Sequence, residues 1–141
     1  MVKKLCEKMF KIKDLMCKQV VTAKDNLSIQ EAIQLLSERH VGSIVIIDDE
    51  NRCIGMFTER DAIRVVAQKM RLDELLNKVM STHVATISLE SSFDEAKNLM
   101  LSRKIRHLPV TDQTGKLIGL FSIRAFLDEV FGMKTTAQSP T

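Results

Sequence analysis

The chain contains one segment twice. Residues 16–66 recur at 80–130 without insertion or deletion, at a constant offset of 64 residues from Met16/Met80 onward. A constant register of this kind indicates a tandem of one supersecondary unit. Since units of this size seldom bury a core alone, we expect the copies to pack on each other, with the seam between them as the natural place for a ligand. Identical pairs include Val20/Val84, Thr22/Thr86, Ser28/Ser92, Glu31/Glu95, Ala32/Ala96, Arg39/Arg103, Gly55/Gly119, Phe57/Phe121 and Arg60/Arg124.

Composition favours one compact domain with an aliphatic core. The chain has 141 residues, is 45% hydrophobic and 28% charged, and contains no Trp or Tyr. A net charge of +3 is too small to favour nucleic-acid binding. The three cysteines, Cys6, Cys17 and Cys53, form no CxxC motif, and their odd number favours free thiols in a reducing compartment. With no signal peptide and no apolar run long enough to span a bilayer, we expect a cytoplasmic protein without membrane contact.

Each copy has the pattern of a β-α-β-β-α unit. Residues 20–22 form a β-type stretch, and Ser28 with Glu31 forms a capping box at the start of a helix. An apolar hairpin follows, and its returning strand, which contains Gly55, runs directly into a second helix over 59–70. Glycine inside such a strand often marks a bulge or the close approach of another backbone or of a ligand. The second copy repeats these elements over 84–86, from Ser92, at Gly119 and over 123–130.

The repeat also predicts the domain organisation. Residues 1–13 are basic with apolar positions at helical spacing, so we expect an N-terminal helix or arm that packs onto the module; contact with an anionic membrane is the alternative. Residues 14–70 form the first copy, and 71–132 form a linker and the second copy. The linker residues 71–80 have a helical pattern, which predicts a rigid linker helix. The polar tail, 133–141, is expected to be disordered. We therefore expect an α+β fold in which the two units pack about a pseudo-twofold axis through their sheets, with the helices outside.

The strand-to-helix junction of the first copy carries the most informative chemistry. Thr58 is the expected N-cap of the second helix, and Asp61 lies three residues later on the same side of the first turn. A helix N-terminus offers N–H groups and a partial positive charge, which suit a phosphate. The hydroxyl can donate to a phosphate, and the carboxylate can accept two hydrogen bonds from a ribose diol. The same spacing is also that of an ordinary capping box, so both interpretations remain open.

The two copies differ at the positions that matter most for this choice. The second copy keeps the cap as Ser122 but has Ala125 in place of Asp61. Conversely, it has Arg106-His107 where the first copy has Gly42-Ser43. A carboxylate from one copy and a cationic pair from the other would complete one asymmetric site for an anion and a diol, if opposite copies contribute to each cleft. A solvated strand edge is the alternative for the cationic pair.

The segments VGSIVIIDDENRCIGMFTERD and IRHLPVTDQTGKLIGLFSIR resemble a tandem pair of CBS domains, named after cystathionine β-synthase, of the stand-alone prokaryotic type. The resemblance covers Asp14 to about Phe131. It implies two pseudo-symmetric clefts that often bind adenosine-containing ligands such as AMP, ADP, ATP, NAD(H) or S-adenosylmethionine. It also implies that modules pair through their helices into flat, disc-like homodimers.

Carried over by position, the resemblance implies a role for each residue of the first cleft. Asp61 would accept from the ribose hydroxyls, with Thr58 near ribose and phosphate. Val84 and Ala85 would form an apolar and main-chain wall for adenine. His107 would bind phosphate better as imidazolium, so phosphate should raise its pKa. The full set of expected nucleotide-binding residues is Phe57, Thr58, Asp61, Val84, Ala85, Arg106, His107, Pro109 and Arg124.

The second cleft departs from the pattern at Ala125, so we expect it to bind weakly or to stay empty. It would hold Thr22, Ser43, Arg60 and Ser122. No HExxH, CxxC or carboxylate cluster predicts a metal site, and no motif predicts catalysis.

We therefore expect a regulatory module, not an enzyme, that binds an adenine nucleotide, most simply AMP or ATP, and signals to an unidentified protein partner. It would require no cofactor. A ligand-free dimerisation and protein-interaction module, or a sensor of NAD(H) or S-adenosylmethionine, is the alternative. Nucleic-acid binding through the basic N-terminal segment is a third, less favoured hypothesis.

Overall fold

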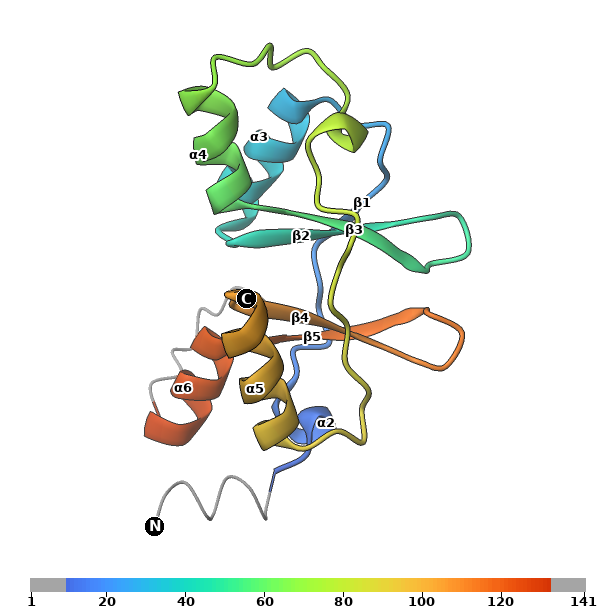
Figure 1. Cartoon of the computed structure of the whole chain (residues 1–141), viewed down its shortest axis with the longest axis vertical. Helices are drawn as coiled ribbons and strands as arrows, with labels where there is room; N and C mark the ends of the chain where they lie inside the picture. The colour runs from blue at the N-terminus through green and yellow to red at the C-terminus, as the bar shows by residue number, and fades with distance from the viewer. Residues whose placement is uncertain (1–9, 133–141) are drawn as a thin grey trace.

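The structure, a computed structural model, describes residues 10–132. Most of the expected N-terminal arm (residues 1–9, with Cys6) and the expected disordered tail (133–141) lie outside the described residues. Figure 1 shows the two copies stacked on each other, with the sheets facing across the middle and the helices on the two outer sides. This arrangement confirms the α+β class and the packing through sheets that the repeat predicted.

The first copy forms a three-stranded sheet covered by two helices. Its elements are β1 (Thr22–Ala23), α3 (Ile29–Arg39), β2 (Ser43–Ile47), β3 (Cys53–Thr58) and α4 (Glu59–Ala67). β1 pairs parallel with β2, and β2 pairs antiparallel with β3. The predicted capping box of α3 is confirmed, because the Glu31 N–H donates to the Ser28 hydroxyl at 3.0 Å and the Ser28 N–H donates back to the Glu31 carboxylate at 3.3 Å.

The second copy forms only a two-stranded sheet. Its elements are α5 (Phe93–Arg103), β4 (His107–Thr111), β5 (Leu117–Ser122) and α6 (Ile123–Phe131). No strand forms over 84–86, so this prediction is wrong; the next residue, Ile87, makes a single parallel bridge to Val110. The two copies therefore share helices and hairpins but differ in their first strand.

Proline in β4 explains this difference. In the first copy the N–H of Val45 donates to the carbonyl of Val21 at 3.1 Å. Pro109 occupies the position equivalent to Val45 and has no N–H, so the matching bond to the carbonyl of Ala85 cannot form. Pairing starts one step later, where the Ile87 N–H donates to the Pro109 carbonyl at 3.0 Å. The Ala85 carbonyl thus lacks the strand hydrogen bond that its counterpart accepts.

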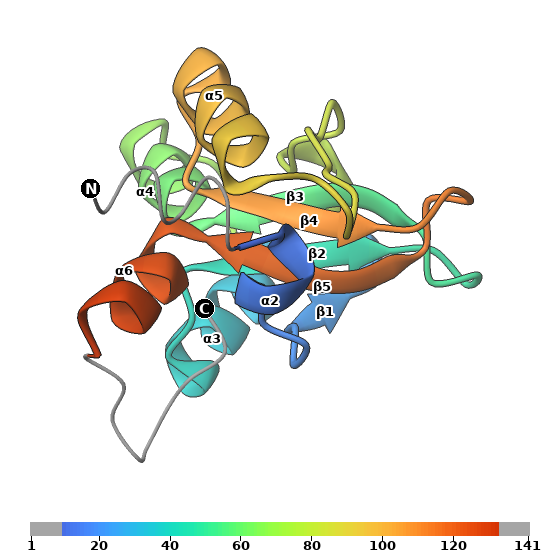
Figure 2. The same ribbon diagram turned by 90° about the horizontal axis from the view of Figure 1, so that it is seen from below.

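The chain crosses between the copies twice (Figure 1), and each crossing segment makes an isolated antiparallel bridge to one strand of a sheet. Helix α2 (Ile12–Leu15) packs in the core of the second copy, so this part of the expected N-terminal arm joins the far unit. Figure 2 shows α2, where the first crossing begins, lying over β5. Cys17 then exchanges two backbone hydrogen bonds with Leu120 of β5, at 2.8 and 2.9 Å. The linker does the same in the other direction, where Ser81 and Met56 of β3 exchange bonds of 2.9 and 3.0 Å. The two units are therefore interlocked.

The crossings explain why both copies have a glycine within the returning strand. A Cβ at Gly55 would lie 2.9 Å from the Ser81 carbonyl oxygen, and one at Gly119 would lie 3.0 Å from the Cys17 carbonyl oxygen. The interpretation that these glycines mark the close approach of another backbone is confirmed.

The predicted linker helix over 71–80 is wrong. Only a short 3-10 turn, η1 (Leu76–Lys78), forms there. The reason is that the linker makes its hydrogen bonds with the start of α3: the N–H groups of Ile29 and Gln30 donate to linker carbonyls, and the Leu76 N–H donates to the Leu27 carbonyl at 2.7 Å. These tertiary bonds satisfy the backbone in place of a local helical ladder.

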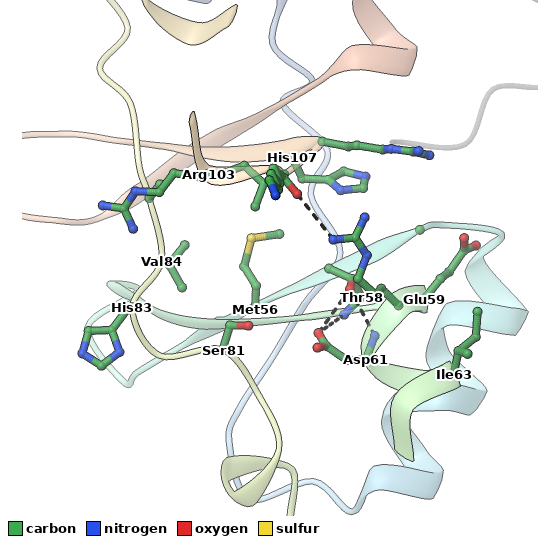
Figure 3. Close-up of a pocket in the computed structure, with 16 residues that line it drawn as sticks. Met56, Thr58, Glu59, Asp61, Ile63, Ser81, His83, Val84, Arg103 and His107 are labelled. Carbon is green, nitrogen blue, oxygen red and sulfur yellow. Dashed lines mark hydrogen bonds between the residues drawn. The ribbon is translucent and has the colours of Figure 1, made fainter. Parts of the chain in front are cut away.

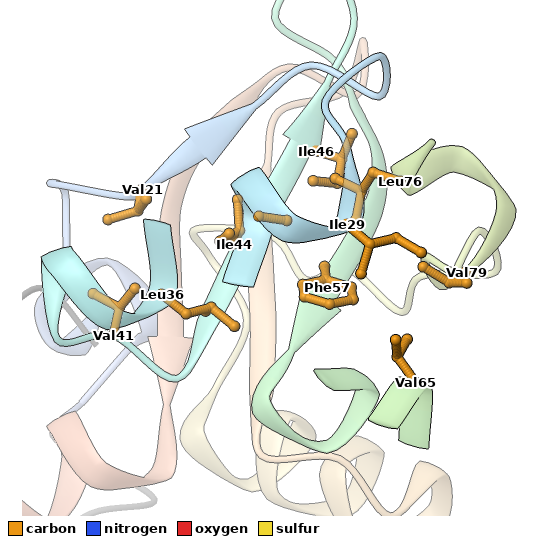
Figure 4. Packing of buried hydrophobic residues seen from close by; sticks show 11 residues of the cluster. Val21, Ile29, Leu36, Val41, Ile44, Ile46, Phe57, Val65, Leu76 and Val79 are labelled. Atoms are coloured by element: carbon orange, nitrogen blue, oxygen red, sulfur yellow. The ribbon is translucent and has the colours of Figure 1, made fainter. Parts of the chain in front are cut away.

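Alternation along the strands divides the apolar residues between two kinds of core. Ile44 and Ile46 of β2 face the helices and join the cluster of the first copy that Figure 4 shows. Val45, between them, faces the seam and packs with Met56 and Leu120 in a separate cluster between the sheets. A cluster that corresponds to that of the first copy fills the second copy. The cluster of Val45, Met56 and Leu120 lies between the two sheets and holds them together.

No helix within residues 10–132 combines the length and the apolar character needed to cross a bilayer.

Candidate functional site

A cavity of about 530 Å³ lies at the seam between the copies. The first copy contributes the end of β3 and the start of α4, and the second contributes the crossing segment after the linker and the approach to β4 (Figure 3). Its size falls in the range of small-molecule sites. The lining residues are Gly42, Met56, Thr58, Glu59, Arg60, Asp61, Ile63, Ser81, His83, Val84, Ala85, Arg103, Lys104, Ile105, Arg106 and His107.

Thr58 and Asp61 form the centre of the site and also a capping box. The Asp61 carboxylate oxygen Oδ2 accepts from the Thr58 N–H at 2.9 Å and from the Thr58 hydroxyl at 3.1 Å. The Asp61 N–H in turn points to the Thr58 hydroxyl oxygen at 3.4 Å. The capping-box interpretation is therefore correct for the described state, and the same carboxylate lines the cavity. The two interpretations do not exclude each other.

The start of α4 has fewer unpaired backbone N–H groups available to an anion than the sequence of the strand-to-helix junction predicted. The N–H groups of Thr58 and Asp61 are bonded within the capping box, and the Glu59 N–H donates to the Gly42 carbonyl at 3.0 Å. The helix dipole still favours negative charge here. Side-chain cations must therefore supply most of the direct contacts to an anionic ligand.

Those cations are present around the cavity. Its charged lining residues are Arg60, Arg103, Lys104 and Arg106, against Glu59 and Asp61. Arg60 reaches across the seam, where its Nη1 donates to the Lys104 carbonyl at 3.4 Å. The excess of cations favours an anionic ligand, and guanidinium groups suit phosphate oxygens because they donate in a planar fork.

His107 lies against the first copy from the start of β4. A Cβ at Gly42 would lie 3.6 Å from its Nε2, so the imidazole packs on that backbone. Burial, followed by the positive charge of Arg106, lowers the pKa of His107 below its ordinary value of 6.5. These surroundings therefore favour the neutral imidazole over the imidazolium. A phosphate placed beside it would act in the opposite direction and favour the imidazolium.

The remaining wall is apolar and main-chain. Met56 from the first copy faces Val84 across the cavity, as Figure 3 shows, with Ala85 and Ile105 completing the lining. Ala85 lines this wall, and its carbonyl lacks the strand hydrogen bond that its counterpart Val21 accepts, because Pro109 has no N–H. Such a surface suits a flat heterocycle that carries a hydrogen-bond donor.

Several expected ligand residues do line the cavity, and three do not. Thr58, Asp61, Val84, Ala85, Arg106 and His107 all line it. Phe57 is fully buried in the helix-facing core and Pro109 lies within β4, so neither side chain reaches the cavity. Arg124 is exposed on α6 and is also absent from the lining.

The residues expected in a second cleft divide in a similar way. Arg60 was predicted there but lines the described cavity, which takes the strand-to-helix junction of the first copy. Ser43 and Ser122 are buried, with 3% and 1% of their surface exposed, and Thr22 pairs in β1. The Ser122 hydroxyl caps α6, whereas the Ser43 hydroxyl has no hydrogen-bond partner among the described residues. The second cleft remains a prediction.

Sequence reasoning missed part of the cationic rim. Arg103 and Lys104 line the cavity, beside Arg106. An extended comparison of the copies would have found Lys104, which replaces His40, but not Arg103, which is identical to Arg39. Ser81 and His83 were missed because they reach the cavity only through the crossing beside Gly55.

Metal ligands are not gathered in the described part of the chain, where no group of three or more His, Cys, Asp or Glu side chains is placed to hold an ion.

The interlocked pair of units with a cavity at their seam is the architecture of a ligand-binding module. The family model for the CBS domain matches the chain twice, over residues 12–68 and 76–132. The chain belongs to the CBS domain family. It is 35% identical over 116 residues to the CBS domain-containing protein YhcV of Bacillus subtilis, covering 82% of this chain and 81% of YhcV.

Solved structures agree with this fold. The CBS domain protein PAE2072 from Pyrobaculum aerophilum, solved in complex with AMP, superposes with a TM-score of 0.79 at 26% identity, over 91% of this chain and 100% of that one. The CBS domain pair of protein MJ0100, solved with 5′-methylthioadenosine and S-adenosyl-L-methionine, has a TM-score of 0.80 at 24% identity, over 89% of this chain and 98% of that one.

Proposed function

We propose that this chain is a regulatory module that binds an adenine nucleotide, AMP in the simplest case, in the cavity at the seam. The observation that carries the proposal is the convergence of the Asp61 carboxylate from one copy with the cationic start of β4 from the other, around one cavity of about 530 Å³. The AMP complex of PAE2072, a related protein, supports the same class of ligand.

Each part of such a nucleotide has a complementary surface. The ribose hydroxyls would donate to Asp61, and the Thr58 hydroxyl can turn from Asp61 toward the ligand. The adenine would lie against Val84 and Ala85, with the Ala85 carbonyl available to its amino group. Arg60 and the Arg106-His107 pair would face the phosphate. Because these groups come from both copies, the ligand would add contacts across the seam.

Regulation would follow from differential binding: a ligand that bridges the copies favours one relative packing, and a partner protein reads that packing. A homodimer through the helices belongs to the same proposal. α4 and α6 expose large apolar side chains, with Ile63, Val66 and Phe131 exposed by 70%, 66% and 67%. Figure 1 places α4 and α6 on the same side of the molecule, and exposed apolar side chains on that side favour an interaction site there. The partner protein itself remains to be identified.

Calorimetric titration with AMP tests the proposal, with sedimentation velocity of the same sample to measure the oligomeric state. We expect one nucleotide per chain, because only the first cleft has the carboxylate. Asp61→Ala should weaken binding by about 10- to 100-fold, the equivalent of losing about 1.5–3 kcal/mol from a charge-assisted contact. Asp73→Ala is the matched control, because Asp73 is an exposed carboxylate that pairs with Arg71 outside the cavity.

Two outcomes would contradict the proposal. Equal affinity of wild type and Asp61→Ala would remove the site assignment. No binding of AMP, ADP, ATP or S-adenosylmethionine would favour the alternative of a module that only dimerises and docks a partner. Thermal shifts give an independent check, since a ligand at 100 times its dissociation constant stabilises by about 2.7 kcal/mol.

A further inference from the structure

Arg64, on the second turn of α4, holds the carboxylate at the centre of the site. Its Nη2 donates to the Asp61 oxygen Oδ1 at 3.2 Å and to the main-chain carbonyl of Val79 at 3.0 Å. The Asp61 side chain is only 13% exposed, whereas that of Arg64 is 42% exposed. One guanidinium therefore joins the carboxylate to the linker just before Ser81, which lines the cavity.

The three donors to Asp61 fix its orientation through both oxygens. Thr58 supplies two donors to Oδ2, and Arg64 supplies one to Oδ1. A carboxylate has about four lone-pair sites, so about one stays vacant in this state. When the Thr58 hydroxyl turns toward a ligand, a second site becomes available. The carboxylate can then accept both hydroxyls of a ribose diol while Arg64 keeps it from rotating.

Comparison of the two copies separates this role from simple helix stability. The cap and the first-turn arginine occur in both copies, as Thr58/Ser122 and Arg60/Arg124. Asp61 and Arg64, in contrast, change together, to Ala125 and Asp128. A helix that begins at the same kind of cap therefore forms in the second copy without the pair. The pair is present only in the copy whose junction lines the described cavity.

We propose that Arg64 is a positioning residue that orients Asp61 to recognise the ribose diol, and so sets the preference of the site for ribonucleotides over 2′-deoxyribonucleotides. This inference rests on the proposed nucleotide-binding function. Arg64 does not line the cavity. Its effect on the ligand is therefore exerted through Asp61.

Titration with AMP and with 2′-deoxy-AMP tests the inference on wild type, Arg64→Ala and Arg64→Lys. Wild type should prefer AMP by about tenfold or more, since 2′-deoxy-AMP loses one hydrogen bond to a charged acceptor. Arg64→Ala should lose about tenfold in affinity for AMP but less than about threefold for 2′-deoxy-AMP, so that the preference largely disappears. Arg64→Lys should recover part of it, because an ammonium can still donate to Oδ1.

Arg71→Ala is the matched control. Arg71 also pairs with an aspartate two residues away, Asp73, at 3.0 and 2.6 Å, but neither residue lines the cavity. This variant should bind both nucleotides as wild type does. Thermal unfolding of each ligand-free variant checks that the fold is intact.

The possible failures are distinguishable. If wild type prefers AMP and Arg64→Ala keeps that preference, the positioning role is overturned while the nucleotide-binding function stands. Equal losses for both nucleotides would also overturn it, because they indicate that Arg64 only supports the linker through Val79. If wild type binds neither nucleotide, the proposed function fails and the inference fails with it.

Discussion

Alanine at Gly55 should detach the linker from the sheet of the first copy. An added Cβ would lie 2.9 Å from the carbonyl oxygen of Ser81 and 2.9 Å from the sulfur of Met80. The sulfur ends a flexible side chain and can move. The carbonyl is backbone, and it accepts the Met56 N–H at 3.0 Å. Relief of the clash therefore requires the linker itself to move away from β3.

The expected cost follows from the contacts that this movement disturbs. The two backbone hydrogen bonds between Met56 and Ser81 contribute about 0.5–1.5 kcal/mol each, and an unrelieved overpacked site costs about 1–3 kcal/mol. We therefore expect Gly55→Ala to lower the free energy of unfolding by about 2–6 kcal/mol. At about 4 °C per kcal/mol for a chain of this size, the unfolding midpoint should fall by about 8–24 °C.

Thermal unfolding by circular dichroism measures this shift, and two other glycines are controls. Gly119→Ala meets the Cys17 carbonyl at 3.0 Å and should be destabilised similarly, but without loss of AMP affinity, because Cys17 does not line the cavity. Gly55→Ala should lose affinity as well, since Ser81 does line it. Gly42→Ala should be tolerated, because its nearest neighbour is 3.6 Å away. A midpoint for Gly55→Ala within about 2 °C of wild type would refute the reasoning.

Two further predictions concern the second copy. Burial and the charge of Arg106 lower the pKa of His107 in the folded protein below 6.5. The unfolded chain therefore binds a proton at this histidine more readily than the folded chain does. The stability that neutral His107 allows is present above pH 6.5 and is lost as the pH falls through the folded-state pKa. Urea unfolding of His107→Gln from about pH 7.5 to 5 should therefore show a smaller loss of stability than wild type, and parallel curves would contradict this. Pro109→Val supplies the missing N–H opposite the Ala85 carbonyl, so the first strand of the second copy should form. A slowly exchanging amide at position 109 is the expected result, and rapid exchange there would show that Pro109 is not what prevents pairing.

Local patterns predicted the elements well where the physical cause is local. Ser28 with Glu31 predicted the start of α3, and Thr58 with Asp61 predicted the start of α4, because capping depends on neighbours within one turn. The linker 71–80 had an equally helical pattern and formed only a short turn. Its backbone found partners at the start of α3, and no local pattern contains that information.

Comparison of the copies pointed to three of the residues that line the cavity. The loss of the carboxylate at Ala125 and the gain of Arg106-His107 pointed to one asymmetric cleft, and Asp61, Arg106 and His107 do line one cavity. Arg60, which was predicted for the second cleft, lines this cavity, whereas Arg124 is not among its lining residues. These two arginines are identical in the sequence, so only the packing of the copies decides which of them reaches which cleft.

The sequence by itself determined the fold class, since an ungapped repeat with matching caps and hairpins leaves few ways to bury its apolar faces. It also determined which chemical groups are available to a ligand. Tertiary structure alone decided how those groups meet: which arginine crosses the seam, how Pro109 releases the Ala85 carbonyl, and how Arg64 holds Asp61 against the linker. The physical reason is that periodicity and capping act within a few residues, whereas these contacts depend on how two interlocked units pack.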